Sequence, residues 1–257
     1  MVITNQKELE TLRECGRRLA GILREVEQAV KPGASTASLD LIAERLIQES
    51  GGEPIFKGYR SLRSEPPFPA SLCTSINDEL VHGIPSLGRM LQDGDIIGLD
   101  IGMRYPRGNG LITDMAVTVG VGTVTEQASV LMRITKESLD CGISVLKSGI
   151  RLGDFGSAVQ KYLEKAGYGV VRDLAGHGVG IKLHEEPFVP NYGKKGVGPI
   201  VLDGMVLALE PMATEHDWHL TLDKDNWTFR TRDGGLAAHF EHTVHVGKNG
   251  AEVLTMV

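Results

Sequence analysis

The sequence predicts one mixed α/β (α+β) domain made of two pseudo-symmetric halves, each with curved antiparallel strands covered by a pair of helices. Three observations support this prediction. Helical pairs occur at corresponding places in the chain, an apolar segment recurs at a constant offset of 110 residues, and each copy of that segment ends in a carboxylate. An internal repeat of this kind indicates a duplicated architecture. We expect a single domain over 1–257, with halves at about 1–121 and 122–257.

The four expected helices come from segments rich in helix-forming residues, with apolar side chains near helical spacing. In chain order they are residues 7–30, about 35–50, 125–147 and about 154–166. Gly51-Gly52 follows the second helix and Gly167 follows the fourth, and glycine is common just past the end of a helix. The two helical pairs therefore occupy matching positions in the two halves.

The expected strands carry the acidic side chains of the repeat. LQDGDIIGLD ends in Asp100 and VLDGMVLALE ends in Glu210, and each reads as an Asp-Gly turn followed by a short buried strand. ITDMAVTV and HFEHTVHV then place Asp114 and Glu241 at the head of β-branched runs that are typical of strands. The repeat thus delivers four carboxylates in matching places.

Composition excludes several classes of protein. The 257 residues are 41% hydrophobic and 23% charged, as in an ordinary globular protein, and no apolar run approaches the ~18 residues of a membrane span. The amino terminus is polar and lacks a secretory signal, and three scattered cysteines indicate reduced thiols. A net charge of −6 argues against a direct nucleic-acid function. We expect a cytoplasmic protein without a membrane partner.

The four carboxylates favour a metal site. A carboxylate beside an apolar strand is costly to bury unless it is paired or bound to metal, although any single one could instead face solvent at a strand end. Four converging carboxylates without a cation would repel one another. Mn, Fe, Co and Zn accept carboxylate ligands together with imidazole. Two such ions could activate water and polarise a carbonyl, which is the chemistry of amide hydrolysis.

Histidines supply the second signal. His82 in LVHGIP and His184 in LHEEP occupy matching positions of the two halves, and His177 lies among glycines in GHGVG. Neither a zinc-binding HExxH motif nor a phosphate-binding Gly-Lys-Ser/Thr loop is present. Three further histidines surround Glu241. Strand alternation places His239 and His245 on the face of Glu241 and His242 on the opposite face, and we interpret all three as structural or supporting residues.

The motifs, taken together, resemble a known family. VHGIP, GLDIG, LITDMAVT, GHGVGIKLHEEP, VLALEPM and HFEHTV, in this order, are similar to type I methionine aminopeptidases over nearly the whole chain. The resemblance implies the pita-bread fold of two pseudo-symmetric halves. It also implies metal-dependent removal of the initiator methionine from nascent proteins and peptides.

The resemblance implies a role for each site residue. It implies two divalent ions (Co, Mn, Fe or Zn) held by Asp100, Asp114, His177, Glu210 and Glu241. Asp114 and Glu241 would bridge the ions, and Glu210 would also carry protons. His184 would hydrogen-bond the scissile peptide or stabilise the oxyanion, and His82 would position the leaving part of the substrate and assist proton transfer.

The expected methionine pocket differs from the family pattern. Its substrate-binding residues would be Tyr59, Phe68, Cys73 and Trp227, together with His82 and His184. Phe68 replaces a common Tyr, Phe56 a common Cys and Leu183 a common Phe. Phe56 and Leu183 could equally belong to the pocket or to the core. An apolar pocket containing sulfur and aromatic rings suits a thioether side chain.

Two insertions also depart from the family. RSLRSEPP, residues 60–67, interrupts the pocket segment, and the interval from Asp100 to Asp114 is a few residues longer than is usual. A longer hairpin should be tolerated, because the cost of loop closure grows slowly with length.

Three alternatives remain open at this point. An Xaa-Pro aminopeptidase-like enzyme or a creatine-type amidinohydrolase of the same fold would carry an added amino-terminal domain, which this chain lacks. A non-catalytic pita-bread binding module would have lost metal ligands, and none is lost here. The resemblance implies amino-terminal peptides and nascent chains as partners, is compatible with docking on the ribosome, and favours a monomer.

Overall fold

The computed structural model describes residues 1–60 and 66–256. Within them the helices are α1 (Gln6–Gln28), α2 (Thr36–Glu49), α3 (Glu126–Val145) and α4 (Leu152–Lys165). The first seven strands are β1 (Glu53–Pro54), β2 (Leu72–Ile76), β3 (Glu79–Val81), β4 (Ile96–Tyr105), β5 (Leu111–Gly120), β6 (Gly169–Val170) and β7 (Gly176–Gly178). The remaining strands are β8 (Glu185–Val189), β9 (Val206–Leu209), β10 (Met212–Thr214), β11 (Leu220–Leu222), β12 (Phe229–Thr231), β13 (Ala237–His239), β14 (Glu241–Val246) and β15 (Ala251–Val253).

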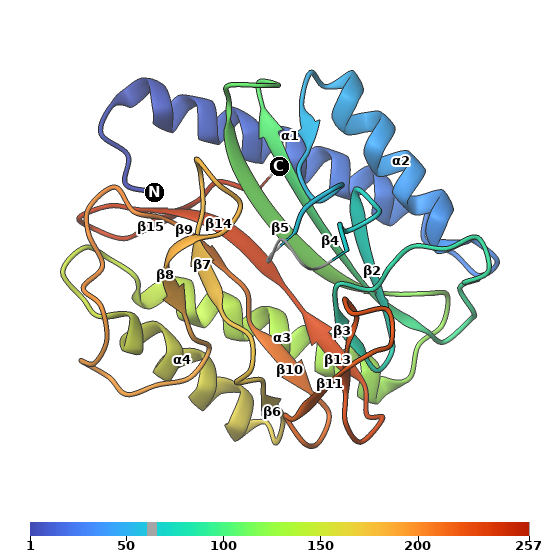
Figure 1. The fold of residues 1–257 in the computed structure, drawn as a ribbon. Helices are drawn as coiled ribbons and strands as arrows, with labels where there is room; N and C mark the ends of the chain where they lie inside the picture. Colours follow the sequence, from blue (N-terminus) through green and yellow to red (C-terminus); the bar gives the residue numbers. More distant parts are fainter. Residues whose placement is uncertain (61–65, 257) are drawn as a thin grey trace.

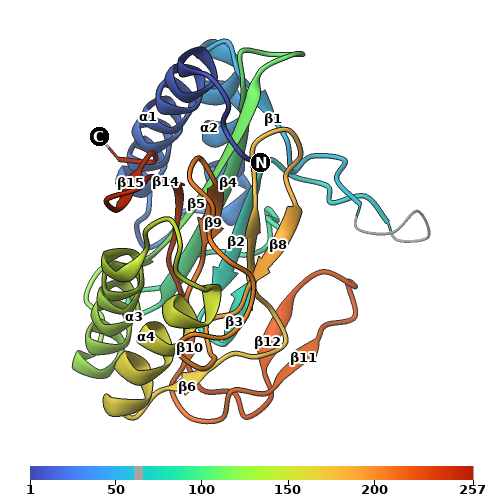
Figure 2. The same cartoon turned by 90° about the vertical axis from the view of Figure 1, so that its left-hand side faces the viewer.

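A nine-stranded sheet forms the centre of the molecule. Its main path runs β1-β4-β5-β14-β9-β7-β8, with β2 paired to β4 and β15 paired to β14, and all of these pairings are antiparallel. The four helices lie against one side of this sheet, while β11 and β12 lie toward the other (Figures 1 and 2). The face away from the helices is therefore available for a site.

The helices start where the sequence provides capping side chains. The Asn5 side chain accepts a hydrogen bond from the backbone N–H of Glu8 at the start of α1, and Thr125 caps α3 in the same way. Each of the four helices begins and ends within two residues of its predicted position. The predicted α/β class is confirmed.

Two hydrophobic clusters lie between the sheet and the helices. One joins α1 and α2 to β4, where Leu99, Ile101 and Met103 are fully buried. The other joins α3 and α4 to β9 and β14. Alternation along β4 turns Asp100 and Gly102 away from the first cluster, toward the helix-free face. The separate clusters agree with two halves, although the boundary near residue 121 stays a prediction.

Two local predictions were wrong. Asp114 does not begin a strand, because β5 starts three residues earlier, at Leu111, and Asp100 lies inside β4 rather than at its end. Both strands extend because β4 and β5 pair without interruption from Ile96↔Gly120 to Tyr105↔Leu111. Glu241, in contrast, is the first residue of β14 as predicted.

The long interval between Asp100 and Asp114 is explained by this hairpin. Asp100 pairs with Ala116 and Asp114 pairs with Gly102 in one constant register, so the extra residues lie at the hairpin tip, away from both acids. The other predicted insertion, RSLRSEPP, falls largely on residues 61–65, which lie outside the described residues.

Candidate metal centre and substrate pocket

Five neighbouring strands bring the predicted metal ligands together. Asp100 lies on β4, Asp114 on β5 and His177 on β7, while Glu241 begins β14 and Glu210 directly follows β9. In the sheet these strands are adjacent in the order β4-β5-β14-β9-β7. Residues distant in sequence therefore meet because each strand contributes one polar side chain to the same face.

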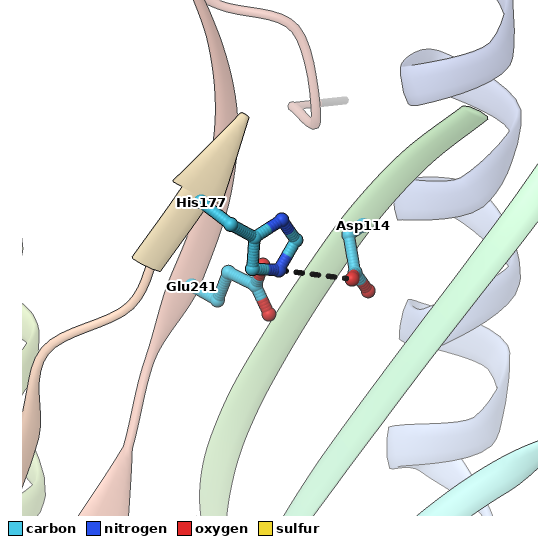
Figure 3. Close-up of side chains that lie close together, drawn as sticks. All are labelled: Asp114, His177 and Glu241. Atoms are coloured by element: carbon cyan, nitrogen blue, oxygen red, sulfur yellow. Dashed lines mark ion pairs between the residues drawn. The ribbon is translucent and has the colours of Figure 1, made fainter. Parts of the chain in front are cut away.

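Three of these side chains form a compact group. Ligand atoms of Asp114, His177 and Glu241 all lie within 4.8 Å of one another, and the side chains point toward a common centre (Figure 3). His177 Nε2 lies 3.6 Å from Glu210 Oε1 and 4.0 Å from Asp114 Oδ2. Glu210 therefore belongs to the same cluster.

Three carboxylates of this cluster each have one oxygen that lacks a hydrogen-bond donor. Asp100, Asp114 and Glu241 are at most 8% exposed, and within residues 1–60 and 66–256 one buried oxygen of each has no hydrogen-bond partner. Buried polar atoms in proteins are normally satisfied, so unpaired carboxylate oxygens that face one another indicate a cation site. The donor set of carboxylates and one imidazole fits divalent metal ions.

Burial also shifts the pKa values of these groups. Desolvation raises the pKa of Asp100 to about 7, although the Cys73 thiol opposes this by donating a hydrogen bond to it. Desolvation and then repulsion by neighbouring carboxylates raise the pKa values of Asp114, Glu210 and Glu241 well above their usual range. Burial lowers the pKa of His177 to about 3, so its imidazole is neutral and able to bind metal.

His184 lies at the edge of the cluster. Its ring centroid is 4.3 Å from that of His177, and its Nδ1 lies 2.5 Å from the hydroxyl oxygen of Tyr59. When the Tyr59 hydroxyl donates to Nδ1, the second ring nitrogen of His184 carries the proton and is a donor. His82 follows β3 with φ of 59°, in the left-handed region that non-glycine residues rarely adopt, so the backbone holds it in an uncommon conformation.

One cavity contains every predicted site residue. It is lined by Tyr59, Phe68, Cys73, His82, Asp100, Asp114, His177, His184, Glu210, Trp227 and Glu241, and also by Phe56, Val81, Leu183 and His239. Phe68 and Trp227 meet edge to face, with ring centroids 5.3 Å apart. Phe56 and Leu183, for which pocket and core were both open, line the cavity and belong to a hydrophobic cluster as well.

Sequence reasoning missed Val81 and His239 as cavity residues. The signal for His239 was present, since it lies two residues before Glu241 and strand alternation gives them one face. His245 shares that face but lies beside Glu252, with 3.9 Å between Nδ1 and Oε2. His242 points to the opposite side, where its Nδ1 lies 2.9 Å from the Thr255 hydroxyl.

Comparison with known proteins gives a consistent result. A family model described as metallopeptidase family M24 matches residues 10–248. The chain is 45% identical to a methionine aminopeptidase of Clostridium acetobutylicum over 256 residues, covering all of this chain and 99% of that protein. It is 43% identical to methionine aminopeptidase 1 of Bacillus subtilis over 257 residues, covering both chains completely.

A solved structure extends the comparison to the fold. The crystal structure of a methionine aminopeptidase from Thermotoga maritima superimposes with a TM-score of 0.94 at 40% identity, covering all of both chains. This similarity confirms the predicted pita-bread fold. No helix within residues 1–60 and 66–256 is long and apolar enough to cross a membrane. The family match and the unpaired buried carboxylates agree on the use of divalent metal. The chain belongs to metallopeptidase family M24.

Proposed function

We propose that this chain removes the initiator methionine from nascent proteins and peptides by metal-dependent hydrolysis of the first peptide bond. The observation that carries the proposal is one cavity in which five metal-ligand side chains adjoin an apolar wall of Phe68, Cys73 and Trp227. Relatives that match the full chain are named methionine aminopeptidases. The Xaa-Pro and creatine-type alternatives are not favoured, and complete ligands argue against a binding module.

The metal centre of the proposal holds two divalent ions, drawn from Co, Mn, Fe or Zn. Their ligands would be Asp100, Asp114, His177, Glu210 and Glu241. Bound ions of this kind supply Lewis-acid activation of water and of the scissile carbonyl. Four acidic side chains are needed because they neutralise the positive charge that two such ions bring into a buried site.

The protein side chains would transfer protons and stabilise the charge that develops on the substrate. Glu210 lies within reach of the centre of the cluster and would take the proton of the attacking water and return it to the leaving amine. His184, held through its Nδ1 by Tyr59, would donate a hydrogen bond to the oxyanion that develops on the carbonyl oxygen. His82 would position the leaving part of the substrate and assist the proton transfer.

The cavity also explains action at the amino terminus. The substrate α-amine would lie near Asp100, and the methionine side chain would contact Phe68, Cys73 and Trp227. These three residues are at most 8% exposed, so the methionine side chain would lie in the interior of the protein. His184 is exposed and marks the mouth through which the rest of the chain would leave.

The cellular setting remains part of the proposal. We place the enzyme in the cytoplasm, acting as a monomeric catalytic domain on chains that emerge from the ribosome. The three cysteines are free thiols, which suits a reducing compartment. Sedimentation analysis at micromolar concentration tests whether the protein is a monomer.

Release assays on two peptides test the function. Met-Ala-Ser and Ala-Pro-Ala would be incubated with the wild type and Glu210→Gln, first in chelator and then with Mn²⁺ or Co²⁺ restored. We expect metal-dependent release of methionine alone, lost in Glu210→Gln. Release from the proline peptide would instead overturn the substrate, and a metal-loaded protein that cleaves neither peptide would overturn the function.

A further inference from the structure

His239 is a buried imidazole that no part of the proposed mechanism uses. It is the last residue of β13, it is 3% exposed, and it lines the cavity of the metal cluster. Its Nε2 atom is buried and has no hydrogen-bond partner among the residues that the structure describes. A buried ring nitrogen normally has a bonding partner, so we look for the partner of His239 Nε2 in the cavity.

Two carboxylates that we propose as metal ligands lie near Nε2. His239 Nε2 lies 3.8 Å from Glu210 Oε2 and 3.9 Å from Glu241 Oε2. His177 Nε2 lies 3.6 Å from the other oxygen of Glu210, Oε1. The Glu210 carboxylate is therefore placed between two imidazoles, one facing each of its oxygens.

These separations are too long for hydrogen bonds but suit a shared ion. Two atoms that bind one metal at about 2.1 Å each can be at most about 4.2 Å apart. The contacts of His239 Nε2 with Glu210 and Glu241 fall within this limit, as do those of His177 with Glu210 and Asp114. By distance, His239 is as well placed for metal as His177.

The backbone fixes the direction of the His239 side chain. Its N–H donates to the Thr118 hydroxyl at 2.9 Å, and its carbonyl accepts from the same hydroxyl at 2.8 Å. β13 is also paired with β10, where His239 faces Met212. Because Thr118 lies on β5, the strand that carries Asp114, the imidazole is anchored to the sheet that builds the cluster.

We propose that His239 is a further metal ligand, which adds a second imidazole to the centre that Glu210 and Glu241 help to build. The inference rests on the proposed metal centre and adds one ligand to it. With His177 and His239 the centre has two nitrogen donors. Imidazole suits Zn and Fe, whereas Mn favours oxygen ligands, so the added histidine shifts selectivity away from Mn²⁺.

X-ray absorption at the zinc edge tests the proposal directly. Wild type, His239→Gln and the control His242→Gln would be saturated with Zn²⁺. The number of imidazole ligands per protein would then be obtained from the outer-shell scattering of the rings. His242 is the matched control because it lies on the neighbouring strand β14 with its ring bound to Thr255, away from the cavity. We expect two imidazoles in the wild type and in His242→Gln, and one in His239→Gln.

A second readout uses metal competition rather than activity. Titration of Zn²⁺ against Mn²⁺ should show a preference for zinc that falls about 10–100-fold in His239→Gln, the loss typical of removing a close contributor to a metal site. An unchanged imidazole count in a fully loaded His239→Gln overturns the inference while leaving the metal centre intact. A wild type that binds no metal overturns both. If His239→Gln does not fold, one imidazole in the wild type overturns the proposal and two support it.

Discussion

The acidic side chains of the cluster lie in surroundings that disfavour their charge. Asp114 and Glu241 are each 3% exposed and retain an oxygen without a hydrogen-bond donor. Their pKa values are raised by burial first and by neighbouring carboxylates second. These raised pKa values favour the protonated forms in the metal-free protein, and a metal ion must displace any bound proton when it binds.

Metal uptake should therefore release protons and strengthen as the pH rises. The raised pKa of about 7 for Asp100 means that this group holds a proton in a large share of molecules at pH 7. Burial also raises the pKa of Glu210 well above its usual range, which favours its protonated form. His177 contributes no proton because its pKa is lowered to about 3. Calorimetric titration at pH 7 in buffers of different ionisation enthalpy measures the release. Equal heats in all buffers would contradict the predicted release of protons on metal binding.

Removing His184 should impair chemistry more than metal binding. Loss of one oxyanion donor costs about 10²–10³ in kcat, so we expect a fall of that size for His184→Ala. Tyr59→Phe removes only the hydrogen bond that orients His184, worth about 1 kcal/mol, and should cost about fivefold. Steady-state kinetics with parallel metal analysis would check both variants. Equal rates in wild type and His184→Ala would refute the role.

The sequence alone identified most of the side chains that line the cavity. Asp100, Asp114, Glu210 and Glu241 were proposed as ligands because the internal repeat placed acids at matching positions. His239 was assigned a supporting role because strand alternation shows only that it shares the face of Glu241. Its meaning depends on the distances to Glu210 and Glu241, which only the assembled sheet defines.

Among the elements, the β4–β5 hairpin shows what sequence spacing can and cannot define. The interval between Asp100 and Asp114 departs from the family, yet the register at both acids is regular. The number of residues between two acids does not reveal whether the additional residues form a bulge beside the site or lengthen the tip of the hairpin. Helix ends were predicted to within two residues because caps and apolar periodicity are local signals.

Helix α1 offers a matched pair of glycines for testing its packing. A Cβ at Gly16 would lie 2.2 Å from the backbone oxygen of Leu254, whereas a Cβ at Gly21 would meet nothing within 4 Å. Gly16→Ala should therefore destabilise the protein by about 1–3 kcal/mol through overpacking. Gly21→Ala should instead stabilise it by up to about 1 kcal/mol through helix propensity. Urea unfolding measures both. Similar effects from the two changes would contradict the close packing of α1 against Leu254.

In the molecule as a whole, the cavity combines residues from the two predicted halves. Asp100 and Asp114 come from the hairpin of the first half, while His177, Glu210 and Glu241 come from strands of the second. The joining contact is the pairing of β5 with β14, through Glu241↔Ala116. No local pattern predicts such a pairing, and the repeat suggested only that the halves correspond.

The assembled protein should gain stability from metal. Ions that bind only the folded state stabilise it by about 2.7 kcal/mol when free metal is 100 times Kd, and for a chain of this size that raises Tm by roughly 5–10 °C. Thermal unfolding in chelator and in excess Mn²⁺ would measure the shift. The variant Glu241→Gln, which removes a predicted ligand, should respond less. An identical Tm with and without metal in the wild type would contradict a buried metal centre.

An anomalous difference map from crystals soaked in Mn²⁺ tests the proposed metal centre most directly. A two-metal centre predicts two peaks about 3.5–4 Å apart, surrounded by the five predicted ligands and with Asp114 and Glu241 between them. Crystals saturated with Mn²⁺ that show no peak there, or peaks only elsewhere on the protein, would contradict the claim that neighbouring strands of the central sheet build a two-metal peptidase centre.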